Sequence, residues 1–530
     1  MIVPAGRPAL YRCLYRRLDA VISPVPLFRA LCDDGRRPHT ILLESADPEG
    51  AIHRSVAVLS SALSVTCEGE DVTVAALNAN GQALLPTLAY RPGWAIKSAA
   101  RHAVTVRVPR PSGLRLEHER LRAGGAFDVV RTLLRLLQPA VAGIPESVFL
   151  PGIISYDMVG EFEGLPAPAD AGRDVPDFRF YLADRLVVVD HQRRQSEIIA
   201  LVVNGVEGEE ESARDDISII TEWAGRPEQW AGPPAAVAAP EPEADLDDAA
   251  FAALVTRLKA NIIAGDVFQV VPSRTFSVPC TDPLAAYEVL REREPVPYLF
   301  YVNAGGFILF GASPEAALRV DGSAGTIEVS PIAGTRPRGR ASDGRLDAEL
   351  DARLEAELRL DPKEQAEHLM LVDLARNDVA RVCRPGTRRV AELMRIRRYG
   401  RVMHLVSRVE GTLAAGLDAL HACQAVLPMG TLTGAPKHRA MELLRGAEAG
   451  HRGLYGGAVG FLAADGSLDA AIVIRAAVVR DGIARVRAGA GVVHDSIPLR
   501  EAEETRSKAE AVLEAIAMSA AQTGGGFHAR

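Results

Sequence analysis

The sequence predicts an α+β fold with antiparallel sheets, and three observations lead to that prediction. Apolar segments recur in pairs around tight turns, as at Asp465-Gly466 and Asp481-Gly482, which is typical of a meander of antiparallel strands. Helical patterns are interleaved with these hairpins but lack the strand, helix, strand rhythm of a doubly wound sheet. No repeat of about 20 to 50 residues indicates a solenoid.

The composition is that of an ordinary globular protein, with 48% hydrophobic and 24% charged residues. Its 530 residues suffice for two or three domains or for one large intertwined core. No apolar run is long enough to span a bilayer, and Arg12, Arg16 and Arg17 interrupt the start, so we expect neither membrane insertion nor a signal peptide.

Charge and cysteine usage restrict the partners and the compartment. The net charge of -8 offers no basic field, so no nucleic acid is expected as a partner. The six cysteines form no C-x-x-C pair, which argues against a zinc site and a disulfide framework. Reduced thiols suit the cytoplasm, where we place the chain.

Hairpins are expected in the first part of the chain. Strands are predicted at residues 64–67, 72–77, 186–189 and 198–203. Residues 68–71 form the turn between the first two strands, and Asn80-Gly81 predicts a further turn. Residues 230–248 are rich in Pro, Ala, Glu and Asp, which is typical of a linker. We therefore divide the chain into residues 1–240, an N-terminal region, and residues 241–530, a second region.

Helices and strands are clearer in the second region. Helices are predicted at residues 251–264, 283–291, 436–444 and 500–517, with Gly265 ending the first, Asp282 capping the second and Pro436 starting the third. Strands are predicted at residues 268–271, 298–302, 307–310, 326–330, 458–462, 470–479 and 484–488.

Residues 364–378 carry the most informative helical pattern. Pro362 suits the first helical position, and the pattern predicts a mostly buried face made of Leu369, Met370, Leu371, Val372, Leu374 and Ala375. Glu367 lies one turn before Met370 and Leu371, on the same stripe. A carboxylate there needs a cation, a hydrogen-bonded partner or a raised pKa. It is either a structural carboxylate paired with a distant Arg or a metal ligand, and the pattern leaves both open.

A second acidic group lies in the last predicted helix, where Glu504 belongs to a dense acidic run. Such a run at a helix N-terminus is usually a solvated face. Together with Glu367, however, Glu504 could bind one hard divalent ion, because magnesium sites often use one or two carboxylates and leave other positions to water and substrate. Only the fold can bring the two side chains together.

Three Gly-containing turns could bind an anion through backbone N–H groups. They are Gly334-Thr335, the run that begins at Thr431, and Gly489-Ala490-Gly491. Each of them alone is more simply a tight turn. Arg475 follows the apolar residues 470–474 and could hold a carboxylate with two hydrogen bonds.

Two further side chains could move protons. His404 lies in an apolar segment, where a histidine is more often structural, but imidazole also suits proton abstraction near neutral pH. Glu315 follows Pro314 at the end of a predicted strand and could either cap a helix or act as a general acid.

Taken together, these motifs resemble those of the chorismate-utilising enzymes, and within them the large components of anthranilate synthase. The resemblance covers about residue 250 to the end and is weaker at the front. The matching runs are LLES (42–45), FQVVPSR (268–274), FGASPE (310–315), PIAGTRPRGR (331–340), EHLMLVDLARND (367–378), VMHLVSRV (402–409), MGTLTGAPK (429–437), YGGAVG (455–460), IVIR (472–475), AGAG (488–491) and ETRSKA (504–509).

The resemblance implies an α/β/β/α sandwich of two facing, mainly antiparallel sheets with helices outside. It also implies that chorismate and ammonia give anthranilate and pyruvate through 2-amino-2-deoxyisochorismate. Chorismate would lose its 4-hydroxyl group as ammonia adds at C2, and pyruvate would then be eliminated.

Site roles follow from the resemblance at the matching positions. Glu367 and Glu504 would hold Mg²⁺, the implied cofactor, which acts as a Lewis acid on the ring carboxylate. Glu315 would protonate the leaving hydroxyl, and His404, with Thr431 near it, would remove the ring proton. The two carboxylates of chorismate would be held by Gly334, Thr335, Tyr455, Arg475, Gly489, Ala490 and Gly491.

Two positions indicate which reaction of the family applies. Relatives that add water carry Lys at the position of Gln269, where a base must activate the water, and a neutral Gln suits ammonia, which is already nucleophilic. Aminodeoxychorismate relatives usually carry Lys at the position of Ala333. The resemblance therefore favours ammonia as nucleophile and anthranilate as product.

Ammonia requires a source. A fused glutamine amidotransferase would need a nucleophilic Cys on a strand-turn-helix elbow and a His, and little chain follows the last predicted helix. We therefore expect a separate glutamine amidotransferase subunit, anthranilate synthase component II, and a hetero-oligomer.

Regulated members of the family have a tryptophan site made from L-L-E-S and N-P-S-P-Y-M. The corresponding residues here are Ser45, Pro297, Tyr298 and Leu299. Glu294 replaces a neutral Asn and Val296 removes a hydroxyl, which predicts reduced feedback inhibition by tryptophan and raises a secondary pathway as the alternative to tryptophan synthesis.

Two other functions remain open from the sequence. One is a synthase that stops at the amino intermediate or makes 4-amino-4-deoxychorismate. The other is a non-catalytic sensor that binds tryptophan or chorismate without turnover, against which the set Glu315, Glu367, His404 and Glu504 argues.

Overall fold

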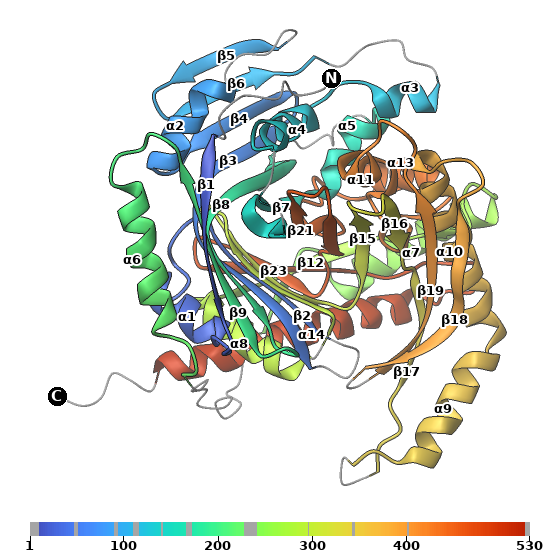
Figure 1. Cartoon of the computed structure of the whole chain (residues 1–530). Coiled ribbons are helices and arrows are strands. Elements are labelled where there is room, and N and C mark those ends of the chain that lie inside the picture. The colour runs from blue at the N-terminus through green and yellow to red at the C-terminus, as the bar shows by residue number, and fades with distance from the viewer. Residues whose placement is uncertain are drawn as a thin grey trace.

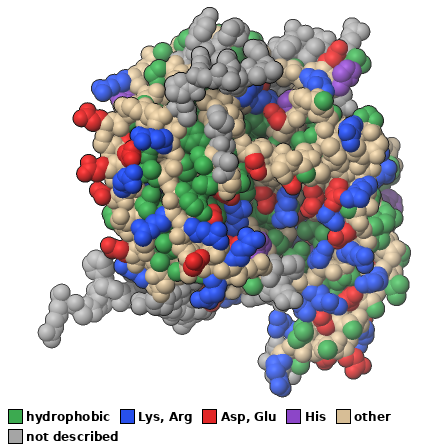
Figure 2. All heavy atoms as spheres, viewed as in Figure 1, with side chains coloured by type: hydrophobic (Ala, Val, Ile, Leu, Met, Phe, Trp, Pro, Cys, Tyr) green, Lys and Arg blue, Asp and Glu red, His purple; other side chains and the backbone are tan. Residues whose placement is uncertain are grey.

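The structure, a computed structural model, describes residues 10–46, 51–88, 94–109, 116–138, 141, 143–165, 172–226, 241–294, 296–341, 345–399 and 402–524. Its layers are helix, sheet, sheet, helix (Figure 1), which confirms the predicted α+β sandwich. On the face seen in Figure 2, acidic and basic side chains are intermixed. Within the described residues, no helix is both long enough and apolar enough to cross a membrane.

The helices are α1 (Pro24–Leu31), α2 (Ala79–Leu88), α3 (Glu117–Arg122), α4 (Phe127–Leu136), α5 (Val159–Glu163), α6 (Glu209–Thr221), α7 (Asp248–Ile263), α8 (Pro283–Arg293), α9 (Ala348–Leu360), α10 (Pro362–Val382), α11 (Ala419–Val426), α12 (Gly430–Thr433), α13 (Lys437–Ala447) and α14 (Pro498–Gly524), with short 3-10 turns at η1 (Pro145–Ser147) and η2 (Tyr156–Met158).

The strands are β1 (Tyr11–Leu18), β2 (Thr40–Ala46), β3 (Ile52–Glu68), β4 (Asp71–Ala76), β5 (Ala95–Ala100), β6 (Ala103–Arg107), β7 (Phe149–Ile154), β8 (Phe178–Asp190), β9 (Gln195–Val203), β10 (Glu243–Ala244), β11 (Gln269–Val270), β12 (Ser273–Pro279), β13 (Tyr298–Asn303), β14 (Ile308–Ser313), β15 (Ala316–Asp321), β16 (Thr326–Val329), β17 (Ile332–Pro337), β18 (Arg389–Arg398), β19 (Val402–Thr412), β20 (Gly434–Ala435), β21 (Ala458–Ala463), β22 (Leu468–Ile472), β23 (Ala476–Arg480) and β24 (Ile483–Gly489).

The two facing sheets are joined through the long strands β3 and β8. One part runs β1-β9-β8-β3-β2-β13-β14-β23-β24-β12-β10, with every pair antiparallel. The other runs β5-β6-β4-β3-β8-β7-β21-β22-β15-β16-β19, and β19 pairs with both β17 and β18. The register of β3 against β8 shifts between Val58 and Leu63. Such bulges bend a strand, and here they lie where β3 passes from one part to the other.

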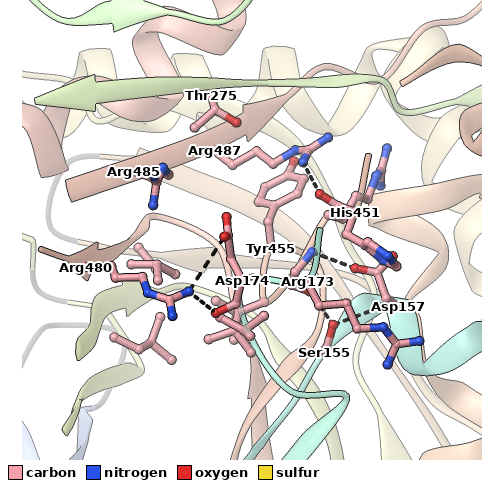
Figure 3. Close-up of a pocket in the computed structure, with 18 of the residues that line it drawn as sticks. Ser155, Asp157, Arg173, Asp174, Thr275, His451, Tyr455, Arg480, Arg485 and Arg487 are labelled. Atoms are coloured by element: carbon pink, nitrogen blue, oxygen red, sulfur yellow. Dashed lines mark hydrogen bonds and ion pairs between the residues drawn. The ribbon is translucent and has the colours of Figure 1, made fainter. Parts of the chain in front are cut away.

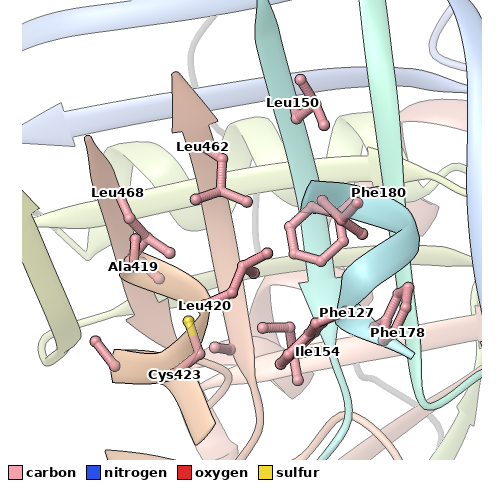
Figure 4. Packing of buried hydrophobic residues seen from close by; sticks show 14 of the residues in the cluster. Phe127, Leu150, Ile154, Phe178, Phe180, Ala419, Leu420, Cys423, Leu462 and Leu468 are labelled. Atoms are coloured by element: carbon pink, nitrogen blue, oxygen red, sulfur yellow. The ribbon is translucent and has the colours of Figure 1, made fainter. Parts of the chain in front are cut away.

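Three apolar clusters separate the layers. The cluster that includes Phe149, Tyr181, Phe300 and Leu309 draws on strands of both parts and lies between them. On the outer face of the first part, α1, α6, α8 and α14 pack onto the strands. On the outer face of the second part, α2, α4, α10 and α11 do the same, and Figure 4 shows Phe127 of α4 near Phe178, with Leu420 of α11 elsewhere in the same cluster. The central strands thus bury both faces, as a sandwich requires, whereas the edge strand β5 is exposed along its length.

Most predicted hairpins and helices are confirmed. The predicted pairs 64–67 with 72–77 and 186–189 with 198–203 correspond to β3–β4 and β8–β9. Helices α7, α8, α10 and α14 include the predicted ranges, except that α7 ends at Ile263. Asp361 caps α10 by accepting from the backbone N–H groups of Lys363 and Glu364, and Pro362 occupies the first turn as predicted.

The turn predicted at Asn80-Gly81 is wrong, because both residues lie in α2. The buried Asn80 amide donates to Asp184 and Glu209, and its Oδ1 accepts from the N–H of Val203. A Cβ on Gly81 would lie 1.9 Å from the carbonyl oxygen of Ala62, so the glycine allows α2 to lie against β3. Residues 80 and 81 are helical because they pack closely against strands that are distant in the sequence, and no local pattern reveals such packing.

Three smaller expectations also need correction. The predicted strand 470–479 is interrupted at Arg475, whose φ of 50° separates β22 from β23. The strand predicted at 268–271 is reduced to Gln269–Val270, and Phe268 is 71% exposed. Leu369, expected on the buried face of α10, is 49% exposed.

The predicted regions 1–240 and 241–530 share one sheet in the structure. β2 of the first region pairs with β13 of the second, and β7 pairs with β21. Most of the predicted linker, residues 230–240, lies outside the described residues. The division into a regulatory region, residues 1–240, and a chorismate-binding catalytic region, residues 241–530, therefore stays a prediction.

Candidate active site

One pocket of about 490 Å³ lies at the edge of the sandwich, between α10, α14 and the ends of β17, β19 and β24. It gathers eleven of the predicted site residues from across the second region: Glu315, Gly334, Thr335, Glu367, His404, Thr431, Tyr455, Arg475, Gly489, Gly491 and Glu504. Pairing of β17 with β19 places Thr335 opposite His404. The structure therefore brings together side chains that are up to 189 residues apart in the sequence (504 minus 315).

Glu315 lies between β14 and β15 and is 5% exposed. Thr431 of α12 donates a hydrogen bond from Oγ1 to Glu315 Oε1 at 3.1 Å, so it is a contact of the acid rather than of His404. Burial raises the pKa of Glu315 to about 8, because the low-polarity surroundings disfavour the charged form more than the Thr431 and Ile332 hydrogen bonds favour it. Glu315 is therefore mostly protonated at neutral pH and can donate a proton.

His404 on β19 is held in one orientation. Its Nδ1 lies 3.1 Å from the Gly334 carbonyl oxygen and 3.0 Å from Thr335 Oγ1. A carbonyl only accepts, so Nδ1 carries the hydrogen and Nε2 is the unprotonated nitrogen. Burial lowers the pKa of His404, and the Arg475 charge lowers it further. The side chain is therefore a neutral imidazole that can accept a proton.

Arg475 brings a positive charge into the pocket. Burial lowers the pKa of its guanidinium, which nevertheless remains charged. Among the described residues no side chain forms an ion pair or hydrogen bond with it, although Glu294 and Glu504 act on it electrostatically. A half-buried guanidinium without a paired anion suits a ligand carboxylate. Tyr455, 8% exposed, lines the same wall.

Carboxylates gather on the opposite wall. Glu364 and Glu367 of α10 and Glu501 and Glu504 of α14 all line the pocket. Burial, then the charges of Glu364 and Glu504, raise the pKa of Glu367, and burial with the Glu504 charge raises that of Glu501. Mutual repulsion of this kind is relieved by a cation.

These donors fit a magnesium ion. Within the described residues no three His, Cys, Asp or Glu side chains already form a complete ligand set, whereas Mg²⁺ commonly takes one or two carboxylates and fills its remaining positions with water and substrate oxygens. Glu367 Oε1 accepts from the Gln269 amide at 3.1 Å, which leaves its other oxygen for a ligand.

Gln269 is 3% exposed and also presents a buried hydrogen-bond acceptor to the pocket. Its Oε1 is buried and has no hydrogen-bond partner among the described residues. A buried acceptor of this kind is costly unless a ligand satisfies it. An N–H donor such as ammonia would do so.

Two glycines of the pocket allow close approach of neighbouring groups. A Cβ on Gly491 would lie 2.8 Å from Gln269 Nε2, and one on Gly489 would lie 2.7 Å from Tyr455 Oη. Gly334 has a φ of +76° and faces Glu364 and Leu358. Larger residues at the first two positions would displace side chains that line the pocket.

Ala490 needs a correction. Its N–H donates to the carbonyl oxygen of Pro272 at 3.1 Å, and the residue is fully buried outside the pocket lining. It therefore cannot offer that N–H to a carboxylate, and Gly489 and Gly491 remain the candidates.

Lys508, Glu501 and Arg487 also line the pocket and were missed in the sequence. Lys508 Nζ donates to the Gly489 carbonyl at 2.9 Å and pairs with Glu504 at 2.6 Å. Its spacing of four residues from Glu504 is a signal that the sequence does contain. Arg487 on β24 pairs with Glu448, which follows the end of α13, and no local pattern reveals that pair.

The residues of the predicted tryptophan site also meet, away from this pocket. Ser45 on β2 pairs with Tyr298 on β13, and the N–H of Ala46 donates to the Pro297 carbonyl at 3.0 Å. Leu299 points to the other face of the sheet, into the core with α8. Tyr298 donates to Asp469 at 2.9 Å. The structure thus places Ser45, Pro297 and Tyr298 together, and their regulatory role stays a prediction.

Fold and pocket together define a class of protein. The model of the chorismate binding enzyme family matches residues 115–514, and the chain belongs to that family. The matched range crosses the predicted boundary at residue 240. The structure resembles the crystal structure of anthranilate synthase component I from Streptococcus pneumoniae TIGR4 with a TM-score of 0.64 and 27% identity, covering 87% of this chain and 92% of that one.

Curated relatives give a finer placement. An anthranilate synthase component 1 of Pseudomonas aeruginosa, described as pyocyanine specific, is 51% identical over 89% of each chain. The anthranilate synthase component 1 of Salmonella typhimurium is 48% identical over 93% of this chain and 95% of its own length. Within its family the chain therefore belongs to the anthranilate synthase component 1 group. The menaquinone-specific isochorismate synthase of Escherichia coli, at 14% identity and a TM-score of 0.62, shares the fold.

Proposed function

We propose that the protein is the large subunit of an anthranilate synthase, which converts chorismate and ammonia to anthranilate and pyruvate. The observation that carries the proposal is the pairing of opposite proton roles in one pocket. Glu315, whose pKa is raised to about 8, holds a proton, and His404, whose pKa is lowered, lacks one. An acid and a base with pKa values shifted in these directions suit a reaction that both expels a hydroxyl and removes a ring proton.

The first half-reaction uses the acid. Arg475 binds a carboxylate of chorismate, and Glu315 donates its proton to the 4-hydroxyl group as that group leaves as water. Ammonia adds at C2 while one of its N–H groups donates a hydrogen bond to Gln269 Oε1, and the proton that the new ammonium group loses balances the proton that Glu315 gave to the leaving hydroxyl. The product of this step is 2-amino-2-deoxyisochorismate.

The second half-reaction uses the base. His404 Nε2 removes the proton from C2, the enolpyruvyl group leaves as pyruvate, and the ring becomes aromatic. The Gly334 carbonyl keeps the Nδ1 hydrogen in place while this happens. His404→Ala is therefore expected to release the amino intermediate.

Magnesium is the proposed cofactor, held by Glu367 and Glu504. When bound, it would supply a positive charge to the ring carboxylate. In its presence the repulsion among Glu364, Glu367, Glu501 and Glu504 would also be reduced. We expect Glu367→Gln or Glu504→Gln to remove turnover that depends on Mg²⁺ while the protein stays folded.

The proposed partner is a glutamine amidotransferase subunit that supplies the ammonia, so that the working enzyme is a hetero-oligomer. The six cysteines are free thiols, five of them buried, which suits the cytoplasm as its compartment. Tryptophan feedback is proposed to be weak, because Glu294 adds a charge next to the site of Pro297 and Tyr298.

The decisive experiment is product analysis with chorismate, Mg²⁺ and an ammonium salt. Fluorescent anthranilate and equimolar pyruvate are expected. An amino product without pyruvate would favour a synthase that stops at the intermediate or makes 4-amino-4-deoxychorismate, and binding without any product would favour a sensor. Repeating the assay with excess tryptophan tests the feedback proposal, for which unchanged rates are expected.

A further inference from the structure

A second cavity lies behind the active site. It has a volume of about 150 Å³ and is formed by residues 172–177, by the segment from His451 to Tyr455 and by β23 and β24. Tyr455, Ile474 and Arg487 line both this cavity and the catalytic pocket. The two spaces are therefore separated by shared side chains.

The floor of this cavity is apolar. Leu309, Val473 and Ala476 are each at most 9% exposed, and Val478 is half-buried beside them. A cavity of about 150 Å³ with an apolar lining accepts one benzene ring. The size and lining therefore suit a ligand with a single ring.

The walls carry an excess of positive charge. Five arginines line the cavity, Arg173, Arg452, Arg480, Arg485 and Arg487, against three aspartates, Asp157, Asp174 and Asp177. Arg480 pairs with Asp174, and Arg173 pairs with Asp177. Two residues outside the lining also pair with it: Glu448 with Arg452 and Arg487, and Arg445 with Asp157. Their opposite charges cancel, so the five arginines and three aspartates of the lining leave an excess of two positive charges.

Two polar side chains of the cavity, Arg485 and His451, have at least one nitrogen that contacts no side chain among the described residues. Arg485 on β24 forms no ion pair or hydrogen bond with a side chain. The His451 side chain is only 8% exposed; its Nδ1 lies 3.3 Å from Asp157 Oδ1, and its Nε2 has no hydrogen-bond partner among the described residues. Figure 3 shows Arg485 and His451 on opposite sides of the cavity, with Tyr455 between them. The Arg485 guanidinium is therefore the charged group of this cavity that a ligand carboxylate can pair with.

We propose that this cavity binds a one-ring aromatic carboxylate of about the size of benzoate. The ring would lie on Leu309, Val473 and Val478, and the carboxylate would bind Arg485, with the His451 imidazole at the other side. Because the ligand contacts the back of Tyr455 and Arg487, its binding changes the affinity of the catalytic pocket for its substrate, and the coupling is reciprocal. Binding itself does not depend on the proposed function, whereas the effect on chorismate does.

The test uses the full chain and benzoate, a probe that is not a substrate, in titration calorimetry. Saturable binding is expected. Arg485→Gln should weaken it by about tenfold or more, the loss typical of removing one charged hydrogen bond. Val478→Phe, which fills the apolar floor, should weaken it independently of charge. Arg16→Gln is the matched control, because Arg16 is also an exposed strand arginine with no side-chain partner among the described residues.

A variant of the catalytic pocket separates the two sites. Arg475→Lys should retain benzoate binding in the second cavity. The proposal would be overturned if Arg475→Lys lost benzoate binding while Arg485→Gln and Val478→Phe retained it. It would also be overturned if the protein bound inorganic phosphate but not benzoate, or if millimolar benzoate gave no heat of binding. In turnover assays, benzoate should change the KM for chorismate in the wild type and in Arg16→Gln but not in Arg485→Gln. A protein that binds benzoate yet makes no anthranilate would contradict only the proposed function.

Discussion

Individual side chains of the active site owe their chemistry to burial. Glu315 and Glu504 are both acidic, but Glu315 is 5% exposed and has a pKa raised to about 8, whereas the Glu504 side chain is 46% exposed and pairs with Lys508. The residue type alone could not separate the proposed proton donor, Glu315, from the proposed metal ligand, Glu504. Their environments do, because desolvation disfavours charge only where water is excluded.

Replacement of Glu315 by Gln tests the proton donor. The loss of general-acid catalysis is expected to lower kcat by about 10²- to 10⁴-fold. In the wild type the rate should fall as pH rises through about 8, because the protonated form is the active one. The measurement is the steady-state rate of both proteins from about pH 6 to about pH 9, a range that includes the predicted fall near pH 8. If the rate of Glu315→Gln still falls as pH rises through about 8, the fall is caused by the titration of another group.

The same residue predicts a dependence of stability on pH. Its pKa is higher in the folded state, about 8, than its ordinary value of 4.5, so the folded state binds the proton more tightly. Stability is therefore highest at low pH with respect to this group and falls as pH rises from about 4.5 to 8. Urea unfolding at several pH values should show this decline in the wild type and a flatter profile in Glu315→Gln. If the free energy of unfolding changed with pH in the same way in both proteins, the raised pKa of Glu315 would be contradicted.

His404→Ala tests the proton acceptor. Removal of the base should block elimination more than amine addition, so 2-amino-2-deoxyisochorismate should accumulate while anthranilate formation falls by about 10²-fold or more. Chromatography with mass detection measures both products. His438→Ala is the control, since this exposed histidine on α13 lies outside the pocket lining. Anthranilate output at the wild-type rate would exclude His404 as the base.

At the scale of elements, the pocket depends on how helix and strand ends meet. The chain after β24 runs beside Gln269, and Gln269 donates to Glu367 of α10. The short pairing of β11 with β20 fixes Gln269 opposite Ala435. Helical periodicity predicted α10 correctly, but it did not predict that Leu369 is exposed or that Ala490 donates to Pro272.

Gly491→Ala tests this arrangement. The added Cβ, 2.8 Å from Gln269 Nε2, should displace the amide and break its hydrogen bond to Glu367. We expect a higher Mg²⁺ requirement and a rate reduced by about tenfold, the effect of losing one charged hydrogen bond. Magnesium titration of the turnover rate is the measurement.

Gly446→Ala is the matched control for that variant. Gly446 lies in α13, its Cβ would meet nothing within 4 Å, and its φ is not positive. Alanine should stabilise the helix by about 0.5 to 1 kcal/mol without changing activity. An unchanged Mg²⁺ requirement in Gly491→Ala would show that the Gln269 contact does not support the metal site.

At the scale of the molecule, large apolar side chains are exposed near the catalytic pocket. Phe268 precedes the lining residue Gln269, and Ile497 follows the lining residue Ser496; they are 71% and 60% exposed. Ile263 at the end of α7, 69% exposed, is close in sequence to Phe268. Apolar groups exposed around a functional opening are typical of interaction sites. We predict that Phe268 and Ile497 form part of a docking surface for the proposed amidotransferase, which would deliver ammonia to the pocket.

The paired change Phe268→Ser with Ile497→Ser tests that docking surface. Activity with glutamine and the purified amidotransferase subunit should fall by about tenfold or more, because interface anchors carry much of the binding energy. Activity with ammonium salt should stay near the wild-type value. Ile219→Ser is the control, since Ile219 is 48% exposed on α6. An equal loss with both nitrogen sources would instead indicate damage to the pocket.

The sequence alone determined the fold class and the helices α7, α8, α10 and α14, and it selected the candidate site residues, because periodicity, capping and long motifs are local properties. Tertiary structure decided how those residues behave. Burial raises the pKa of Glu315 to about 8, and burial together with the charges of Glu364 and Glu504 raises the pKa of Glu367. The same holds for the second cavity, since Arg173, His451 and Arg485 come from segments that only the folded sandwich brings together. Desolvation and charge proximity depend on distances in space, which a linear pattern does not contain.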